Sequence, residues 1–68
     1  MFKVTRFCVV PWERRRGCLV RGEIRQFHTR EAAQPVVDRL RRRHERVDFY
    51  EVTGWPVQDL WDRPRRVG

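Results

Sequence analysis

The chain begins with an alternation of apolar and polar residues that is typical of a β-strand over residues 2–10. The even positions of this segment are mostly apolar, and we expect them to face the core. They are Phe2, Val4, Cys8 and Val10. Pro11 cannot donate a hydrogen bond to a neighbouring strand, so we expect the strand to end there.

A second alternating segment follows a polar stretch and predicts the other half of a hairpin. Residues 12–17 are polar and close on Gly17, so we expect them to form the hairpin loop. Residues 18–27 then alternate again, with Gly22 as a candidate position for a bulge or a close backbone approach.

A helical repeat replaces the alternation after Thr29, which is a good N-cap residue. Apolar residues recur at four-residue spacing through Leu40, and the pattern predicts one apolar stripe and an end near Glu45. Pro35 lacks a backbone N–H. We therefore expect either a distorted first turn or a regular helix that begins near Gln34.

The last part of the chain predicts a third strand and a short turn. Residues 47–53 are rich in β-branched and aromatic side chains, and Gly54 follows them. Pro56 suits the first position of a short C-terminal helical turn through Trp61. We expect the basic tail at 63–68 to be disordered.

These elements predict an α+β fold, a single ββαβ domain over residues 1–62. One helix covers one face of a three-stranded, mainly antiparallel sheet. We favour the order in which the third strand lies beside the first. A parallel arrangement beside the second strand is the alternative.

Two segments carry a resemblance to known domains. Gln26–Ala32 contains a Phe-x-Thr-x-x-Ala step that opens the helix, and Val47–Val52 is the strand after it. Residues 2–54 resemble small bacterial domains built as hairpin, helix and strand, which have no assigned activity, so the resemblance implies a fold and no function. The order of elements is also similar to the sporulation-related, glycan-binding repeat, whose second helix has no counterpart in this sequence.

Composition excludes several classes of function. The 68 residues contain no Ser, which removes serine nucleophiles, and their single Lys is Lys3. No apolar run reaches the roughly 20 residues of a membrane span, and the start does not have the pattern of a signal peptide. We expect a cytoplasmic bacterial protein that is not an enzyme and binds no membrane.

Four residues have the atom types of a zinc site, but their spacing argues against one. Cys8, Cys18, His28 and His44 are widely separated, and ten residues of strand span about 33 Å. We therefore expect no metal and no cofactor. A cross-strand disulfide between the two cysteines is sterically allowed, but reduced thiols are favoured in a chain of this kind.

The net charge of +7 makes polyanions plausible partners, although 15 of the 16 basic residues are Arg and a GC-rich genome alone can produce that bias. Four of these residues gather on one flank of the expected helix and are candidates for phosphate binding. They are Arg39, Arg42, Arg43 and Arg46. A solvated face laced with salt bridges explains the same pattern.

The odd positions of the hairpin form the expected open face of the sheet, with apolar side chains and arginines interleaved. They are Phe7, Val9, Leu19, Arg21, Arg25 and Phe27. The apolar members favour docking of a protein partner or of a second copy. The alternative is single-stranded nucleic acid, with Phe7 and Phe27 stacking on bases and arginines on phosphates. A third reading is that a tryptophan folds over this face.

Overall fold

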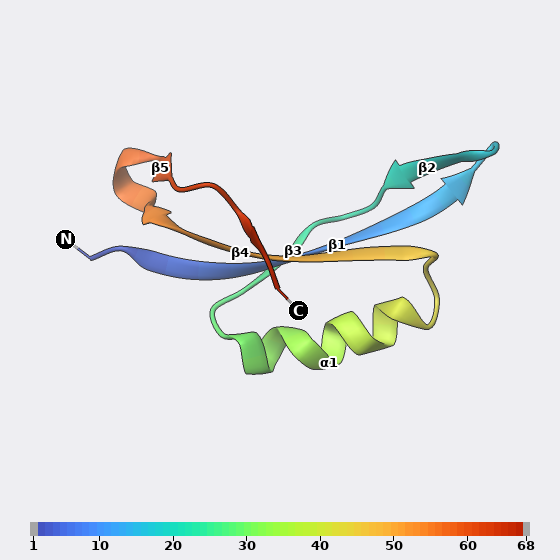
Figure 1. Cartoon of the computed structure of the whole chain (residues 1–68), viewed down its shortest axis with the longest axis horizontal. Helices are drawn as coiled ribbons and strands as arrows, with labels where there is room; N and C mark the ends of the chain where they lie inside the picture. The colour runs from blue at the N-terminus through green and yellow to red at the C-terminus, as the bar shows by residue number, and fades with distance from the viewer. Residues whose placement is uncertain (1, 68) are drawn as a thin grey trace.

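The computed structural model describes residues 2–67, and over these residues one helix packs on a curled antiparallel sheet of six strands (Figure 1). The strands are β1 (Val4–Arg15), β2 (Cys18–Arg21), β3 (Arg25–Phe27), β4 (Arg46–Trp55), β5 (Leu60–Trp61) and β6 (Arg65–Arg66). The helix is α1 (Arg30–Arg41), and a 3-10 turn, η1 (Pro56–Gln58), precedes β5. The α+β class is confirmed. The three-stranded ββαβ description is wrong, because the expected second strand is divided and two short strands follow β4.

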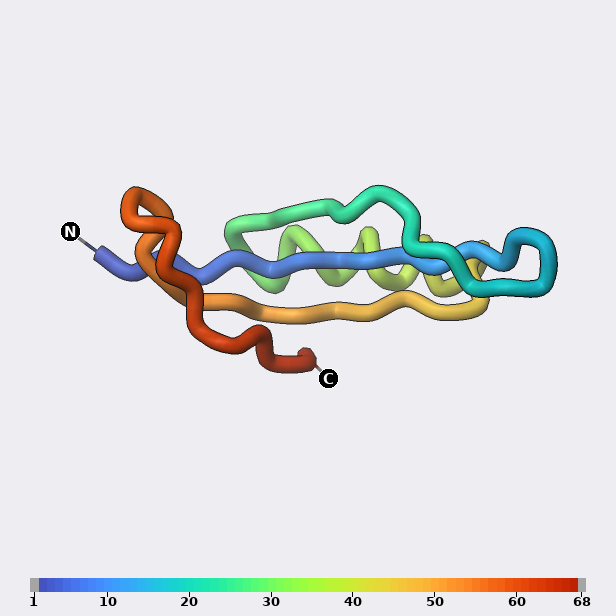
Figure 2. The backbone as a smooth tube through the Cα atoms, turned by 90° about the horizontal axis from the view of Figure 1, so that it is seen from above, coloured from blue at the N-terminus to red at the C-terminus, as the bar shows by residue number. Residues whose placement is uncertain are grey.

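The strand order is β2-β1-β4-β5, with β3 also beside β1 and β6 also beside β4. Figure 2 shows β1 running along the middle, with β3 on one side and β4 on the other. Every pairing is antiparallel. The expected antiparallel neighbourhood of the first strand and the strand after the helix is therefore confirmed.

Pro11 lies inside β1 and does not end it. Its carbonyl oxygen accepts a 2.8 Å hydrogen bond from the Gly22 amide. In a strand, the N and C=O of one residue point to the same edge, so the missing N–H of Pro11 faces the gap between β2 and β3. The ladder with β4, where Pro11 lies opposite Val47, is left intact. The hairpin turn is correspondingly shorter than expected, with Arg16 and Gly17 both at positive φ.

One extra residue separates β2 from β3. Trp12 pairs with Arg21 and Phe7 pairs with Phe27, so the returning chain advances six residues while β1 advances five. Such a bulge turns the following side chains to the other face of the sheet. The odd positions of β2 and the odd positions of β3 therefore point to opposite faces.

The helix begins and ends as its capping contacts require. The Thr29 hydroxyl accepts a 3.1 Å hydrogen bond from the Ala32 amide, so α1 starts directly after Thr29 despite Pro35. It ends at Arg41, four residues before the expected Glu45. Ala33, Val37 and Leu40 are its buried residues and face the sheet.

The core lies between α1 and the odd positions of β1 and β4. Val9 and Val37 are fully buried, Phe49 is 3% exposed, and Phe7 and Phe27 pack against this cluster. The prediction that the even positions of the first strand face the core is wrong. Residues 7–10 are apolar at both parities, so alternation alone does not decide which face the helix covers.

The C-terminal segment returns to the sheet. Instead of a helical turn through Trp61, the chain forms the short η1, turns at Asp59 with a φ of 53°, and adds β5. The tail that we expected to be disordered forms β6, and the Val67 amide donates a 2.8 Å hydrogen bond to the Phe49 carbonyl. The expectation for Gly68 lies outside the described residues.

Between residues 2 and 67, the one helix is too short and too polar to span a membrane.

Candidate functional site

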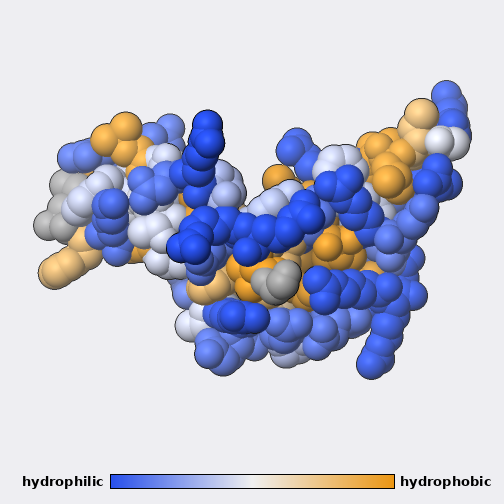
Figure 3. All heavy atoms as spheres, in the orientation of Figure 1, coloured by the Kyte–Doolittle hydropathy of each residue, from blue (hydrophilic) through white to orange (hydrophobic). Residues whose placement is uncertain are grey.

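The face of the sheet away from α1 is concave, because both ends of the sheet rise away from the helix (Figure 1). We call it the concave face. It consists of the even positions of β1 and β4 and the residues that pair beside them, chiefly Arg6, Trp12, Arg46, Asp48, Tyr50 and Trp61. Figure 3 shows the hollow between the two raised ends, with hydrophilic side chains at its edges. Among the described residues, no helix covers this face.

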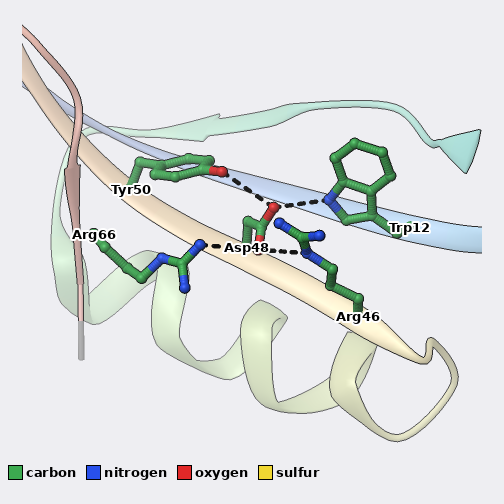
Figure 4. Close-up of polar contacts among 5 residues, drawn as sticks. All are labelled: Trp12, Arg46, Asp48, Tyr50 and Arg66. Atoms are coloured by element: carbon green, nitrogen blue, oxygen red, sulfur yellow. Dashed lines mark hydrogen bonds and ion pairs between the residues drawn. The ribbon is translucent and has the colours of Figure 1, made fainter. Parts of the chain in front are cut away.

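Asp48 is the centre of the concave face (Figure 4). Its Oδ2 accepts hydrogen bonds from the Trp12 indole N–H at 2.8 Å and from the Tyr50 hydroxyl at 3.1 Å. Its Oδ1 accepts one from Arg46 Nε at 3.1 Å, and Arg66 Nη2 lies 3.9 Å away. These four partners come from β1, β4 and β6, so one carboxylate ties three strands together.

The Asp48 carboxylate stays ionised although it is only 6% exposed. Burial alone would raise its pKa. The hydrogen bonds from Arg46, Trp12 and Tyr50 outweigh burial, so the pKa lies below its ordinary value. An acid held in this way does not act as a proton donor near neutral pH. Its role in this arrangement is to fix the side chains around it.

Two tryptophan–arginine pairs stand at the two ends of the concave face. The Arg46 guanidinium lies 5.1 Å from the Trp12 ring centroid, and the Arg6 guanidinium lies 5.2 Å from the Trp61 ring centroid. Arg6 and Trp12 are six residues apart on β1, which corresponds to about 20 Å of strand. Flat cationic and aromatic groups therefore stand at both ends of an extended trough.

Gly54 makes room for the Trp61 end. Trp61 pairs with Gly54, and a Cβ at Gly54 would lie 2.8 Å from Trp61 Cε3 and closer still to the Leu60 carbonyl oxygen. Only a residue without a side chain allows β5 to approach β4 so closely. The same approach places the indole beside Arg6.

The structure does not bring the six predicted interaction residues onto one open face. Val9 is fully buried and Phe7 and Phe27 pack under α1, so the apolar patch on which docking and self-association were based belongs to the core. Arg25 pairs with Val9 on the helix side, and only Leu19 and Arg21 fall on the concave face. The bulge between β2 and β3 is the reason, because it reverses the parity halfway along the expected second strand.

The predicted phosphate-binding flank is also divided. Arg39 lies on α1, while Arg42 and Arg43 follow the last helical turn, and all three are exposed on the helix side. Arg46 begins β4 and bonds to Asp48 on the concave face instead. The helical wheel that grouped these residues does not apply beyond Arg41, where the helix ends.

The two cysteines lie apart. Cys8 is opposite Tyr50 and Gln26, whereas Cys18 is opposite Arg15, so the register excludes a cross-strand disulfide between them. Burial raises the pKa of the Cys8 thiol, and the charge of Arg6 only partly offsets this.

Across residues 2–67, no three His, Cys, Asp or Glu side chains gather as metal ligands would.

The side chains that the structure does bring together were not predicted as a site, although the sequence contains one signal for them. Arg46, Asp48 and Tyr50 alternate along a strand, which places them on one face and pairs a carboxylate with a cation. We assigned only Arg46 to a site. Trp12 was expected in a loop and Trp61 in a helical turn, and a tryptophan over the open face was only the third of three readings.

Comparisons with protein-family models, with curated proteins and with solved structures found no match to this chain. The function is therefore inferred from the geometry of the concave face.

Proposed function

We propose that the concave face binds single-stranded nucleic acid and does so without catalysis. The observation that carries the proposal is the pairing of an aromatic ring with a guanidinium at each end of an open sheet face. Aromatic rings and guanidinium planes stack on unpaired bases, and arginines hold phosphates. The protein's net charge of +7 adds long-range attraction for any polyanion.

The hydrogen bonds of Asp48 support this proposal by fixing the groups that would contact the ligand. The carboxylate holds the Trp12 indole and the Tyr50 ring in place through their polar ends. Preorganised side chains lose less conformational freedom when a ligand binds. Arg66 remains 69% exposed and Arg46 49% exposed, so both guanidiniums keep donors available for phosphate oxygens.

This proposal replaces protein docking as the favoured function for a physical reason. Docking and self-association were predicted from an apolar face that α1 in fact covers. The open face is polar and aromatic, which suits bases and phosphates better than an apolar partner surface. Self-association stays a prediction, now without the residues on which it was based.

The test is a fluorescence-anisotropy titration of a labelled ten-nucleotide DNA single strand at 50 and 300 mM salt. We expect binding that persists at 300 mM salt, is stronger than binding of the matching duplex, and resists competition by heparin. Loss of binding at 300 mM salt, with equal competition by heparin, would mean that only the net charge attracts the strand.

Two tryptophans at one end of the sheet provide a matched pair of variants. Trp61 lies on the concave face, and Trp55, its near neighbour, occupies an odd position of β4 on the other face. We expect Trp61→Ala to weaken binding about tenfold, from the loss of one stacking contact. Trp55→Ala should leave the affinity nearly unchanged. Far-UV circular dichroism on both variants separates loss of binding from loss of fold.

A further inference from the structure

An open depression lies beside the Arg6 end of the concave face. Its volume is about 290 Å³, and Arg6, Gln26, Phe27 and His28 line it. Arg6 is held from two directions, since its Nη1 donates a 3.4 Å hydrogen bond to Gln26 Oε1 and its guanidinium lies against the Trp61 ring. Arg6 therefore connects the depression to the Trp61 ring, on which a base would stack.

Two of the polar side chains at this depression, Arg6 and Gln26, offer mainly hydrogen-bond donors. A guanidinium carries five N–H donors and no acceptor, and Arg6 uses one of them on Gln26. The Gln26 carbonyl oxygen receives that bond, which leaves its NH₂ group with two donors. A ligand group that enters here meets donors from two strands, β1 and β3.

We propose that this depression selects guanine in a bound single strand, an inference that rests on the proposed function. Guanine presents two adjacent acceptors, N7 and O6, and is the base that Arg contacts most often. Adenine and cytosine place an amino donor at the corresponding edge, which Arg6 and Gln26 would leave unpaired. Thymine offers one acceptor, O4, beside a methyl group.

The experiment uses a ten-nucleotide oligomer of deoxycytidine in which one central base is varied. The bases are cytosine, adenine, thymine, guanine, hypoxanthine and 7-deazaguanine. We expect guanine and hypoxanthine, which share N7 and O6, to bind about fivefold tighter or more than cytosine. 7-Deazaguanine, which lacks the N7 acceptor, should lose most of that gain.

A substitution at Gln26 tests whether this depression is the source of the preference. Gln26→Glu replaces two donors with an acceptor, so the preference for guanine should disappear or reverse towards adenine and cytosine. Gln58→Glu makes the same change of charge on the exposed turn η1 and should keep the preference. Both proteins carry the same net charge, and for each one the affinity for the guanine oligomer is divided by its own affinity for the all-cytosine oligomer, so that only the preference is compared.

The outcomes separate this inference from the function on which it rests. Equal affinity for all six oligomers, with binding retained at 300 mM salt, would overturn guanine selection and leave the proposed function intact. A guanine preference that survives Gln26→Glu would also overturn guanine selection by this depression, because another part of the protein would then recognise the base. Absence of binding to every oligomer would overturn both proposals together.

Discussion

Side chains on the two faces of the sheet are shielded from water in different ways. On the helix side, apolar side chains from β1, β4 and α1 exclude water, and Val9 and Val37 are fully buried. On the concave face, none of the elements within residues 2–67 forms a second layer over the sheet, yet Val10 and Asp48 are each only 6% exposed. Around Asp48, the neighbouring groups are aromatic and arginine side chains that the carboxylate holds by hydrogen bonds.

This difference implies two kinds of tolerance to substitution. Apolar packing is non-directional, so the helix side depends on volume and on exclusion of water. A hydrogen-bonded cluster depends on direction and on each partner, because removing one leaves others unsatisfied. The helix side should therefore determine how stable the protein is, and the concave face should determine what it binds.

The largest effect is expected from Phe49→Ala on the helix side. Phe49 is 3% exposed and its ring lies 6.2 Å from that of Phe7, so truncation leaves a cavity at the centre of the core. We expect a loss of about 3–5 kcal/mol in the free energy of unfolding. A chain of this size has about 3–10 kcal/mol in total. Urea unfolding followed by circular dichroism measures the change, with the exposed Val57→Ala as control.

Substitution of Asp48, on the concave face, should have an intermediate effect on stability. Asp48→Asn keeps the shape but turns an NH₂ group towards donors, whether from Arg46 or from Trp12 and Tyr50. We expect a loss of about 1–3 kcal/mol. If urea unfolding showed no loss, the hydrogen bonds would contribute nothing net and the concave face would be held by packing alone.

The pH dependence of unfolding gives a second measure of the same cluster. The pKa of Asp48 is lowered by folding, so its contribution to stability is full well above the ordinary Asp value of about 3.9. That contribution is lost as the pH falls through the lower pKa of the folded state. Between pH 5 and pH 2 the wild type loses the stabilisation that the ionised Asp48 carboxylate provides. The free energy of unfolding of Asp48→Asn should therefore decline less steeply over this range.

Gly54→Ala should have a smaller effect, confined to one end of the sheet. A methyl group at this position meets the Leu60 carbonyl and the Trp61 ring, so β5 must move outward. We expect a loss of about 1 kcal/mol if β5 detaches without disturbing the core. In a ¹H–¹⁵N spectrum, the indole signal of Trp61 should shift while that of Trp12 stays in place. A shift of both signals would mean that the two ends are not independent.

Local sequence signals predicted where the helix and strands lie along the chain better than they predicted which face of the sheet each side chain occupies. Thr29 is the N-cap of α1 as expected, although the alternative start near Gln34 is wrong, and the β-branched run at 47–53 marks most of β4. The side of the sheet that packs against the helix depends on tertiary contacts, since Phe7 and Cys8 are both acceptable in a core. The bulge after Gly22 compounds this, because one residue of register decides where Arg21 and Phe27 point. The candidate site joins residues from β1, β4 and β5, and no spacing within one segment predicts it.

The sharpest test of the comparison comes from two matched double variants, and the one on the helix side should have the smallest effect on stability. Arg39→Ala with Arg42→Ala removes two charges from the helix side, where both side chains are exposed, and should change unfolding by less than about 0.5 kcal/mol. Arg46→Ala with Arg66→Ala removes two charges from the concave face. If only the net charge of the protein attracted the DNA single strand, the two double variants would weaken its binding equally, because their net charges are identical. Contact with the concave face predicts a several-fold larger loss for the second double, measured by anisotropy at 300 mM salt where the field is screened.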